Sequence, residues 1–158
     1  MVWIRSGTTK SVRVRAGLAE VRELLLDVER AGLLMPGVNS LTHVSGAVYH
    51  YALDPITNGA VHLVPDYEAT FDTTDPGHIT WEPYGEHNFR SWGAFTTRES
   101  GVDGEVILEI STRSEASVQV APVMVTLIEP FAQLQTDEIT TGFLDRLRGE
   151  LEPVAVSP

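Results

Sequence analysis

Two changes in the spacing of apolar residues divide the chain into three parts. Residues 11–15 alternate between apolar and basic side chains, which is the period-two pattern of a half-buried strand. Residues 17–32 then have the spacing of an amphipathic helix, with Gly32 as a stop signal. We expect the Leu-Leu-Met that follows to form a second short helix, and Pro36 and Gly37 to turn the chain toward the next strand.

The middle of the chain is rich in Val, Thr, Tyr, Phe and Trp, and turn residues recur in it at short intervals. This composition predicts strands, which we place at residues 40–53, 60–73, 78–84, 88–99 and 105–118. The connections between them have hairpin lengths, so the sheet should be mostly antiparallel. Pro65 interrupts the second of these strands and should mark a bulge or a sheet edge.

Helical spacing returns in the last part of the chain, over residues 122–152. Its apolar residues form two stripes rotated around the axis: Met124, Leu127, Ile128, Phe131 and Leu134, then Ile139, Phe143, Leu147 and Leu151. We expect Pro130 to kink or split this helix, so that each half buries a different side. Phe131 should then be buried, and an aspartate in its place should cost several kcal/mol. Residues 153–158 are expected to be a loose tail.

The order strand, helices, antiparallel strands and long C-terminal helix predicts an α+β fold in which the helices cover one face of the sheet. A chain of 158 residues is long enough for one core and short for two, so we expect a single domain over residues 1–158.

Charge and composition restrict the partners. The net charge of −11 argues against nucleic acid and anionic membrane surfaces, because both attract cationic faces. The chain has no cysteine, which excludes disulfides, thiolate metal sites and a cysteine nucleophile. No apolar run approaches the roughly 18 residues of a membrane span, and the first residues lack a signal-peptide core. We expect a cytoplasmic protein without stable membrane insertion; its oligomeric state is left open.

Three segments carry a resemblance to a known family. They read VRVRAGLAEVRELLLDVERAGLLMPGV (12–38), FRSWGAFTTRESGVDGEVILEIS (89–111) and PVMVTLIEPFAQLQTDEITTGFLDRLRGELE (122–152). In this order they resemble the START-like, helix-grip (SRPBCC) superfamily, and within it the polyketide cyclase/dehydrase-type group. The resemblance implies a curved antiparallel sheet of six to seven strands around a long C-terminal helix, with two short helices after the first strand. It also implies an apolar cavity between sheet and helix, but no shared set of catalytic residues.

Strand alternation and the helical stripe indicate which side chains face the expected cavity. The candidates for lining it are Tyr49, Tyr51, Tyr67, Trp81, Phe95, Met124, Ile128 and Phe131. A buried phenol or indole needs a hydrogen-bond partner and often finds it on a ligand, although aromatics in strands are also ordinary core residues. Between residues 88 and 99 we favour Gly93 and Phe95 as the inner side, since a glycine leaves room beneath the helix.

Polar and metal-binding candidates are few. His87 and Arg90 are candidates for polar groups at a pocket mouth, with an exposed polar turn as the alternative. The five histidines show no HxH, HxxxH or HExxH spacing, so we expect no metal and no cofactor. The chain also lacks GxSxG and a glycine-rich phosphate loop. Catalytic residues therefore stay unknown.

Three functions are compatible with these observations. We favour binding of a hydrophobic small molecule (a lipid, an isoprenoid or a polyketide-like aromatic), which needs only apolar burial in the cavity. The second is a polyketide cyclase or aromatase-like enzyme acting in the same cavity, which requires a general acid or base that the sequence does not identify. The third is a protein-interaction module of the co-chaperone type.

Overall fold

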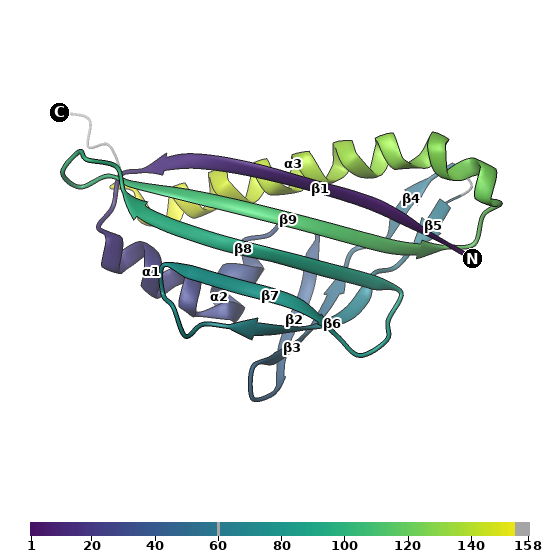
Figure 1. The fold of residues 1–158 in the computed structure, drawn as a ribbon, viewed down its shortest axis with the longest axis horizontal. Coiled ribbons are helices and arrows are strands. Elements are labelled where there is room, and N and C mark those ends of the chain that lie inside the picture. Colours follow the sequence, from purple (N-terminus) through teal and green to yellow (C-terminus); the bar gives the residue numbers. More distant parts are fainter. Residues whose placement is uncertain (60, 154–158) are drawn as a thin grey trace.

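The computed structural model describes residues 1–59 and 61–153 (Figure 1). The elements are β1 (Val2–Val14), α1 (Leu18–Leu26), α2 (Val28–Leu33), β2 (Val38–Ser45), β3 (Val48–Leu53), β4 (Ile56–Asn58), β5 (Val61–Leu63), β6 (Asp66–Asp72), β7 (His78–Tyr84), β8 (Phe89–Glu99), β9 (Val106–Val118), the 3-10 turn η1 (Pro122–Met124) and α3 (Val125–Leu151). Beyond Pro153, the expected loose tail lies outside the described residues.

Seven of the described strands form one antiparallel sheet in the order β1-β9-β8-β7-β6-β3-β2. Figure 1 shows α3 running along the length of β1, with α1 and α2 near the C-terminal end of α3. The predicted α+β helix-grip arrangement is therefore confirmed: an antiparallel sheet accompanies a long C-terminal helix, and two short helices follow the first strand.

The helical segment after β1 is broken earlier than its apolar spacing suggests. α1 ends at Leu26, and the Asp27 side chain accepts a hydrogen bond from the backbone N–H of Arg30 at 3.2 Å, capping a second helix. The second short helix is therefore Val28–Leu33, and the prediction that Leu-Leu-Met forms it is wrong. An aspartate fits both a helix surface and a helix start, and apolar spacing does not distinguish the two.

Two of the predicted strands are each divided. Residues 40–53 contain the hairpin β2–β3, whose turn holds Gly46 at a φ of +53°. The predicted strand 60–73 divides at the buried Pro65 into β5 and β6, and the β4–β5 hairpin forms a separate two-stranded sheet. Pro65 therefore marks an irregularity as predicted, because proline has no N–H to give to a ladder. β1 is also longer than the alternation at 11–15 indicates, since it pairs with β9 from Val2 onward.

The helix α3 is continuous through Pro130, so of the two predicted outcomes the split is wrong, and the kink stays a prediction. Proline removes the hydrogen bond that would go to the carbonyl four residues earlier, here Thr126. Thr126 is exposed, and water can replace that bond. No helix in the described ranges is long and apolar enough to cross a membrane.

The main core lies where α1, α2 and the C-terminal half of α3 meet the sheet. Phe143 and Leu147 of α3 pack there with Leu108 and Ile110 of β9, all of them fully buried. The side of β9 that carries Leu108 and Ile110 therefore faces the core. These contacts hold only one half of α3.

The turn after α2 joins that helix to α3. Pro36 packs against Gly142 of α3, where an added Cβ would lie 2.7 Å from the proline ring. Leu34 and Met35 pack against the main core, whereas Leu33 is exposed. Leu34 and Met35 thus extend the main core between α3 and the sheet at the end where α2 lies.

Candidate functional site

Polar side chains hold α3 along the edge strand β1. β1 pairs with β9 on one side only, so the backbone groups on its other side need partners. Gln133 supplies two, because it accepts a hydrogen bond from the N–H of Gly7 at 3.1 Å and donates one to the Gly7 carbonyl at 2.7 Å. Glu129 accepts a further hydrogen bond from the N–H of Arg5 at 2.9 Å. The helix is therefore seated on the edge of the sheet.

The N-terminal half of α3 is packed much less than the C-terminal half. The buried residues of α3 all lie in its second half: Thr140, Phe143, Leu144 and Leu147. In the first half, Leu127, Phe131 and Leu134 are 61%, 58% and 57% exposed. The prediction that Phe131 is buried is therefore wrong. The hydrogen bonds to β1 hold this half of the helix at the sheet edge, and its apolar side is not packed against the sheet.

A hollow of about 420 Å³ lies beside this half of α3. We call it the outer cavity; its walls are residues of α3 between Ile128 and Ile139, Val61 and Leu63 of β5, and the inner side of β1, β8 and β9. Most of the lining is apolar, and the polar groups on it are those of Ser6, Thr57, Ser114, Gln135, Thr136 and the carboxylate Glu138. The volume falls within the range of about 300–1,000 Å³ that is typical of small-molecule pockets.

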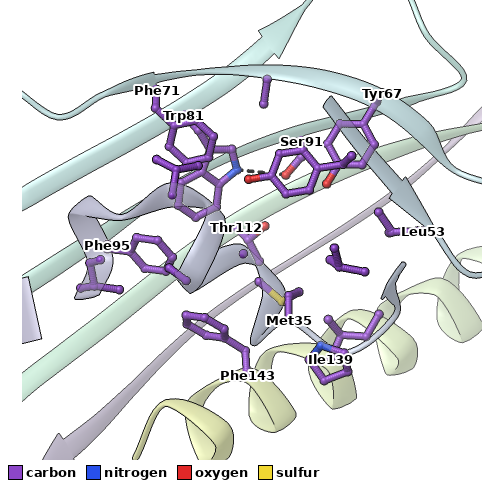
Figure 2. A pocket seen from close by; sticks show the side chains of 18 residues that line it. Met35, Leu53, Tyr67, Phe71, Trp81, Ser91, Phe95, Thr112, Ile139 and Phe143 are labelled. Carbon is purple, nitrogen blue, oxygen red and sulfur yellow. Dashed lines mark hydrogen bonds between the residues drawn. The ribbon is translucent and has the colours of Figure 1, made fainter. Parts of the chain in front are cut away.

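Figure 2 shows the side chains around a second hollow, of about 90 Å³. We call it the inner cavity; its walls include Tyr51, Tyr67, Trp81, Phe95 and Phe143. The residues Leu53 and Ile139 line both cavities, so a molecule in the outer cavity would lie next to the inner one.

Aromatic contacts form much of the inner cavity wall. Tyr51 and Tyr67 are cross-strand partners on β3 and β6, and their rings stack at 5.0 Å with 6° between their planes. The Trp81 ring lies 4.9 Å from Phe95, which stacks on Phe143 of α3 at 5.5 Å. Such pairs each contribute about 0.5–1.5 kcal/mol beyond their burial, so this wall is well ordered.

The polar groups of the inner cavity differ in their partners. The indole N–H of Trp81 donates a hydrogen bond to Oγ of Ser91 at 3.0 Å. The side chains of Tyr51 and Tyr67 are each 8% exposed and line the cavity, and neither phenol oxygen is among the atoms of the described residues that are both buried and without a partner. Burial raises the pKa of Tyr67, and burial together with the neighbouring phenols of Tyr67 and Tyr49 raises the pKa of Tyr51. Both phenols are therefore neutral hydrogen-bond donors at neutral pH.

Six of the eight predicted lining residues border a cavity. Those of the inner cavity are Tyr51, Tyr67, Trp81 and Phe95, and those of the outer cavity are Ile128 and Phe131. Tyr49 borders neither and packs edge-on against Phe71 at 5.7 Å, and Met124 lies in η1 before the helix. A ligand-binding role for these residues stays a prediction.

The two polar candidates lie away from the cavities. Arg90 is on the opposite side of the sheet, where its guanidinium lies 3.7 Å from the centre of the Trp3 ring and 3.3 Å from Glu115. His87 lies 3.9 Å from Glu68, which also points to that side. Neither Arg90 nor His87 lines either cavity, which favours the alternative of a polar turn. Side chains alternate along β8, and the neighbours of Arg90 are the ones that face inward.

Several residues that line the cavities were not predicted from the sequence. Ser91 lies on the same side of β8 as Gly93 and Phe95, and Thr112 lies on the same side of β9 as Leu108 and Ile110, but selection of strand residues by aromatic character left both out. The β4–β5 hairpin wall was missed because β4 falls in the predicted connection between residues 53 and 60, and β5 was taken as the start of the longer strand 60–73. The reason given for Gly93 is also wrong: an added Cβ would lie 2.1 Å from the Trp81 ring, so the space serves the indole and not the helix.

The histidines take part in local contacts. His50 bonds to Asp66 at 2.7 Å, and His78 bonds to Thr96 at 3.1 Å. Within the described ranges no group of three or more His, Asp or Glu side chains is placed to hold a metal ion.

The structure is similar to solved structures over nearly its whole length. A START superfamily protein from Mycobacterium smegmatis aligns with a TM-score of 0.65 and 13% identity, covering 92% of this chain and 96% of the other. The Zhui aromatase/cyclase from Streptomyces sp. R1128 aligns with a TM-score of 0.62 and 15% identity, over 92% and 93% of the two chains. Norcoclaurine synthase from Thalictrum flavum, solved with dopamine and hydroxybenzaldehyde, aligns at 0.60 and 14%, over 94% and 87%.

These similarities show a START-like helix-grip fold, as the resemblance of the sequence implies. At such identities they concern the fold alone. No protein-family model matches the sequence, and no curated protein matches it significantly.

Proposed function

We propose that the protein binds a hydrophobic small molecule between the sheet and α3, with the body of the molecule in the outer cavity. The observation that supports this most is the unequal packing of α3. Its second half is buried in a core, whereas its first half borders a hollow of about 420 Å³ and leaves Phe131 more than half exposed. A helix side that is apolar, incompletely covered and next to a cavity of ligand size favours a molecule that completes the packing.

The lining of the inner cavity favours binding over catalysis. Proton transfer in a cyclase-like reaction needs a group that changes protonation near neutral pH. The titratable groups of the inner cavity are Tyr51 and Tyr67, and burial raises the pKa of both, so they serve as donors and not as bases. A lipid, an isoprenoid or a polyketide-like aromatic remains the expected ligand class. A cytoplasmic location and the lack of a nucleic-acid partner stay predictions from composition.

Binding of N-phenyl-1-naphthylamine, a neutral dye that fluoresces in apolar sites, tests the proposal. The matched variants are Ala132→Trp, which fills the outer cavity, and Thr141→Trp, which adds the same ring to an exposed position of α3 outside both cavities. We expect saturable binding to the wild type, binding at least about tenfold weaker for Ala132→Trp, and unchanged binding for Thr141→Trp. A tenfold change corresponds to about 1.4 kcal/mol.

Thermal unfolding would confirm that both variants are folded. Native mass spectrometry of protein purified under mild conditions adds an independent measurement, because a bound apolar molecule would appear as added mass. A wild type that neither binds the dye saturably nor carries such a molecule would contradict the proposal.

A further inference from the structure

The inner cavity has a lining without charge. Its described walls contain no Asp, Glu, Lys, Arg or His side chain. A carboxylate or an ammonium group entering it would lose its hydration and meet no opposite charge. The part of a ligand that enters this cavity should therefore be neutral.

The same cavity is bordered by two phenol hydroxyls, those of Tyr51 and Tyr67. Tyr51 and Tyr67 are each 8% exposed, and their stacked rings bring the two phenols to the same wall. Figure 2 shows the Tyr67 ring pointing into the pocket, with Trp81 bonded to Ser91 nearby. The hydroxyls of Ser91 and Thr112 also border the cavity, but the two phenols are the pair of donors whose rings are stacked together on one wall. Neither phenol oxygen is a buried atom without a partner, so water reaches both hydroxyls, and a ligand acceptor would take the place of that water.

The size of the inner cavity limits what can enter. At about 90 Å³ it is smaller than the cavity of about 150 Å³ that accommodates a benzene molecule. It therefore has room for a few atoms at the end of a molecule, while the remainder lies in the outer cavity. Leu53 and Ile139 form the border that such a molecule would cross.

We propose that the inner cavity binds a ketone-type carbonyl oxygen at the end of the hydrophobic ligand, through hydrogen bonds donated by Tyr51 and Tyr67. A ketone offers an uncharged acceptor with two lone pairs, which matches two neutral donors on one wall. This inference rests on the proposed function, since it names the chemistry of the ligand that the outer cavity would hold.

Three naphthalenes of nearly equal shape test the inference by isothermal titration calorimetry at neutral pH. They are 2-acetylnaphthalene, a ketone; 2-isopropenylnaphthalene, its hydrocarbon isostere; and 2-naphthoate, a carboxylate. We expect the ketone to bind about tenfold tighter than the alkene, and the carboxylate to bind weakest, because only the ketone satisfies the phenols without bringing a charge.

The variant Tyr51→Phe/Tyr67→Phe keeps the stacked rings and removes both donors. It should bring the ratio of ketone to alkene affinity from about ten to near one, mainly through loss of ketone affinity. The control is Tyr84→Phe, which removes a phenol from a half-exposed tyrosine of β7 outside both cavities and should leave the ratio unchanged. Thermal unfolding would check the fold of each variant, and the wild-type ratio tests the inference without any variant.

The outcomes separate this inference from the proposed function. Equal wild-type affinity for ketone and alkene, a preference for the carboxylate, or a ratio unaffected by the double substitution would overturn the inference while leaving apolar binding intact. Binding of N-phenyl-1-naphthylamine without binding of the ketone would do the same. Failure of the dye and of all three naphthalenes to bind would overturn both.

Discussion

Two phenylalanines of α3 should contribute very differently to stability. Phe143 is fully buried and stacks on Phe95 at 5.5 Å, whereas Phe131 is 58% exposed at the outer cavity. Phe143→Ala should lower the free energy of unfolding by about 3–5 kcal/mol, toward the lower end because the adjacent inner cavity lets neighbours relax. Phe131→Ala should lower it by about 1 kcal/mol or less, because full burial of a Phe side chain contributes about 1.5–3 kcal/mol and less than half of this one is buried.

Urea unfolding followed by circular dichroism would measure the difference. With a slope of about 1–3 kcal/mol per molar urea, Phe143→Ala should lower the unfolding midpoint by about 1 M or more, and Phe131→Ala by a fraction of that. An unchanged slope in both variants would show that the same cooperative transition is being compared. Phe131→Asp serves as a sharper control, since a charge at an exposed position should cost little, in contrast to the several kcal/mol expected from the sequence.

The reasoning would be refuted if Phe131→Ala lowered the midpoint as far as Phe143→Ala. The N-terminal half of α3 would then be packed onto the sheet in solution. The outer cavity would be closed, and the proposed binding site would lose its main wall.

Two further predictions concern α3 and the paired tyrosines. Gly149→Ala meets open space and should stabilise the protein by about 0.5–1 kcal/mol through helix propensity, whereas Gly142→Ala should destabilise it by contact with Pro36; equal gains in calorimetry would contradict that contact. Burial raises the pKa of Tyr67, so its contribution to stability is fully present below its unfolded pKa of about 10 and is lost as pH rises above it. Tyr67→Phe should therefore reduce the loss of unfolding free energy between about pH 9 and 11, and an identical loss in wild type and variant would exclude the effect.

Much of the fold could be predicted because local patterns and tertiary burial agree in most elements. On β9 the alternation that includes Leu108 and Ile110 is also the one that faces the core. The errors fall where one residue has two local interpretations. Asp27 suits both a helix surface and a helix start, and the separate β4–β5 hairpin depends on how the chain turns before the buried Pro65.

The candidate site was less predictable because distant contacts determine it. Phe131 and Phe143 both occupy apolar stripes of the same helix, and spacing alone does not say which stripe is covered. That is decided by where the helix is seated, and Gln133 bonds to Gly7, 126 positions away in the chain.

Small residues complete the arrangement and explain why aromatic character alone did not locate the cavity. Tyr49 and Tyr51 both point to the inner side of β3, yet only Tyr51 borders the inner cavity. There, α2 approaches closely at Gly32, where an added Cβ would lie 3.5 Å from the Tyr51 ring and 2.3 Å from Leu41. Because any larger residue at position 32 would push α2 away from this wall, the position of the phenol depends on a glycine in another element. Tyr51 is a candidate hydrogen-bond donor to a ligand because α2 can approach it at Gly32. The sequence alone does not show that these two residues are in contact, since they belong to different elements.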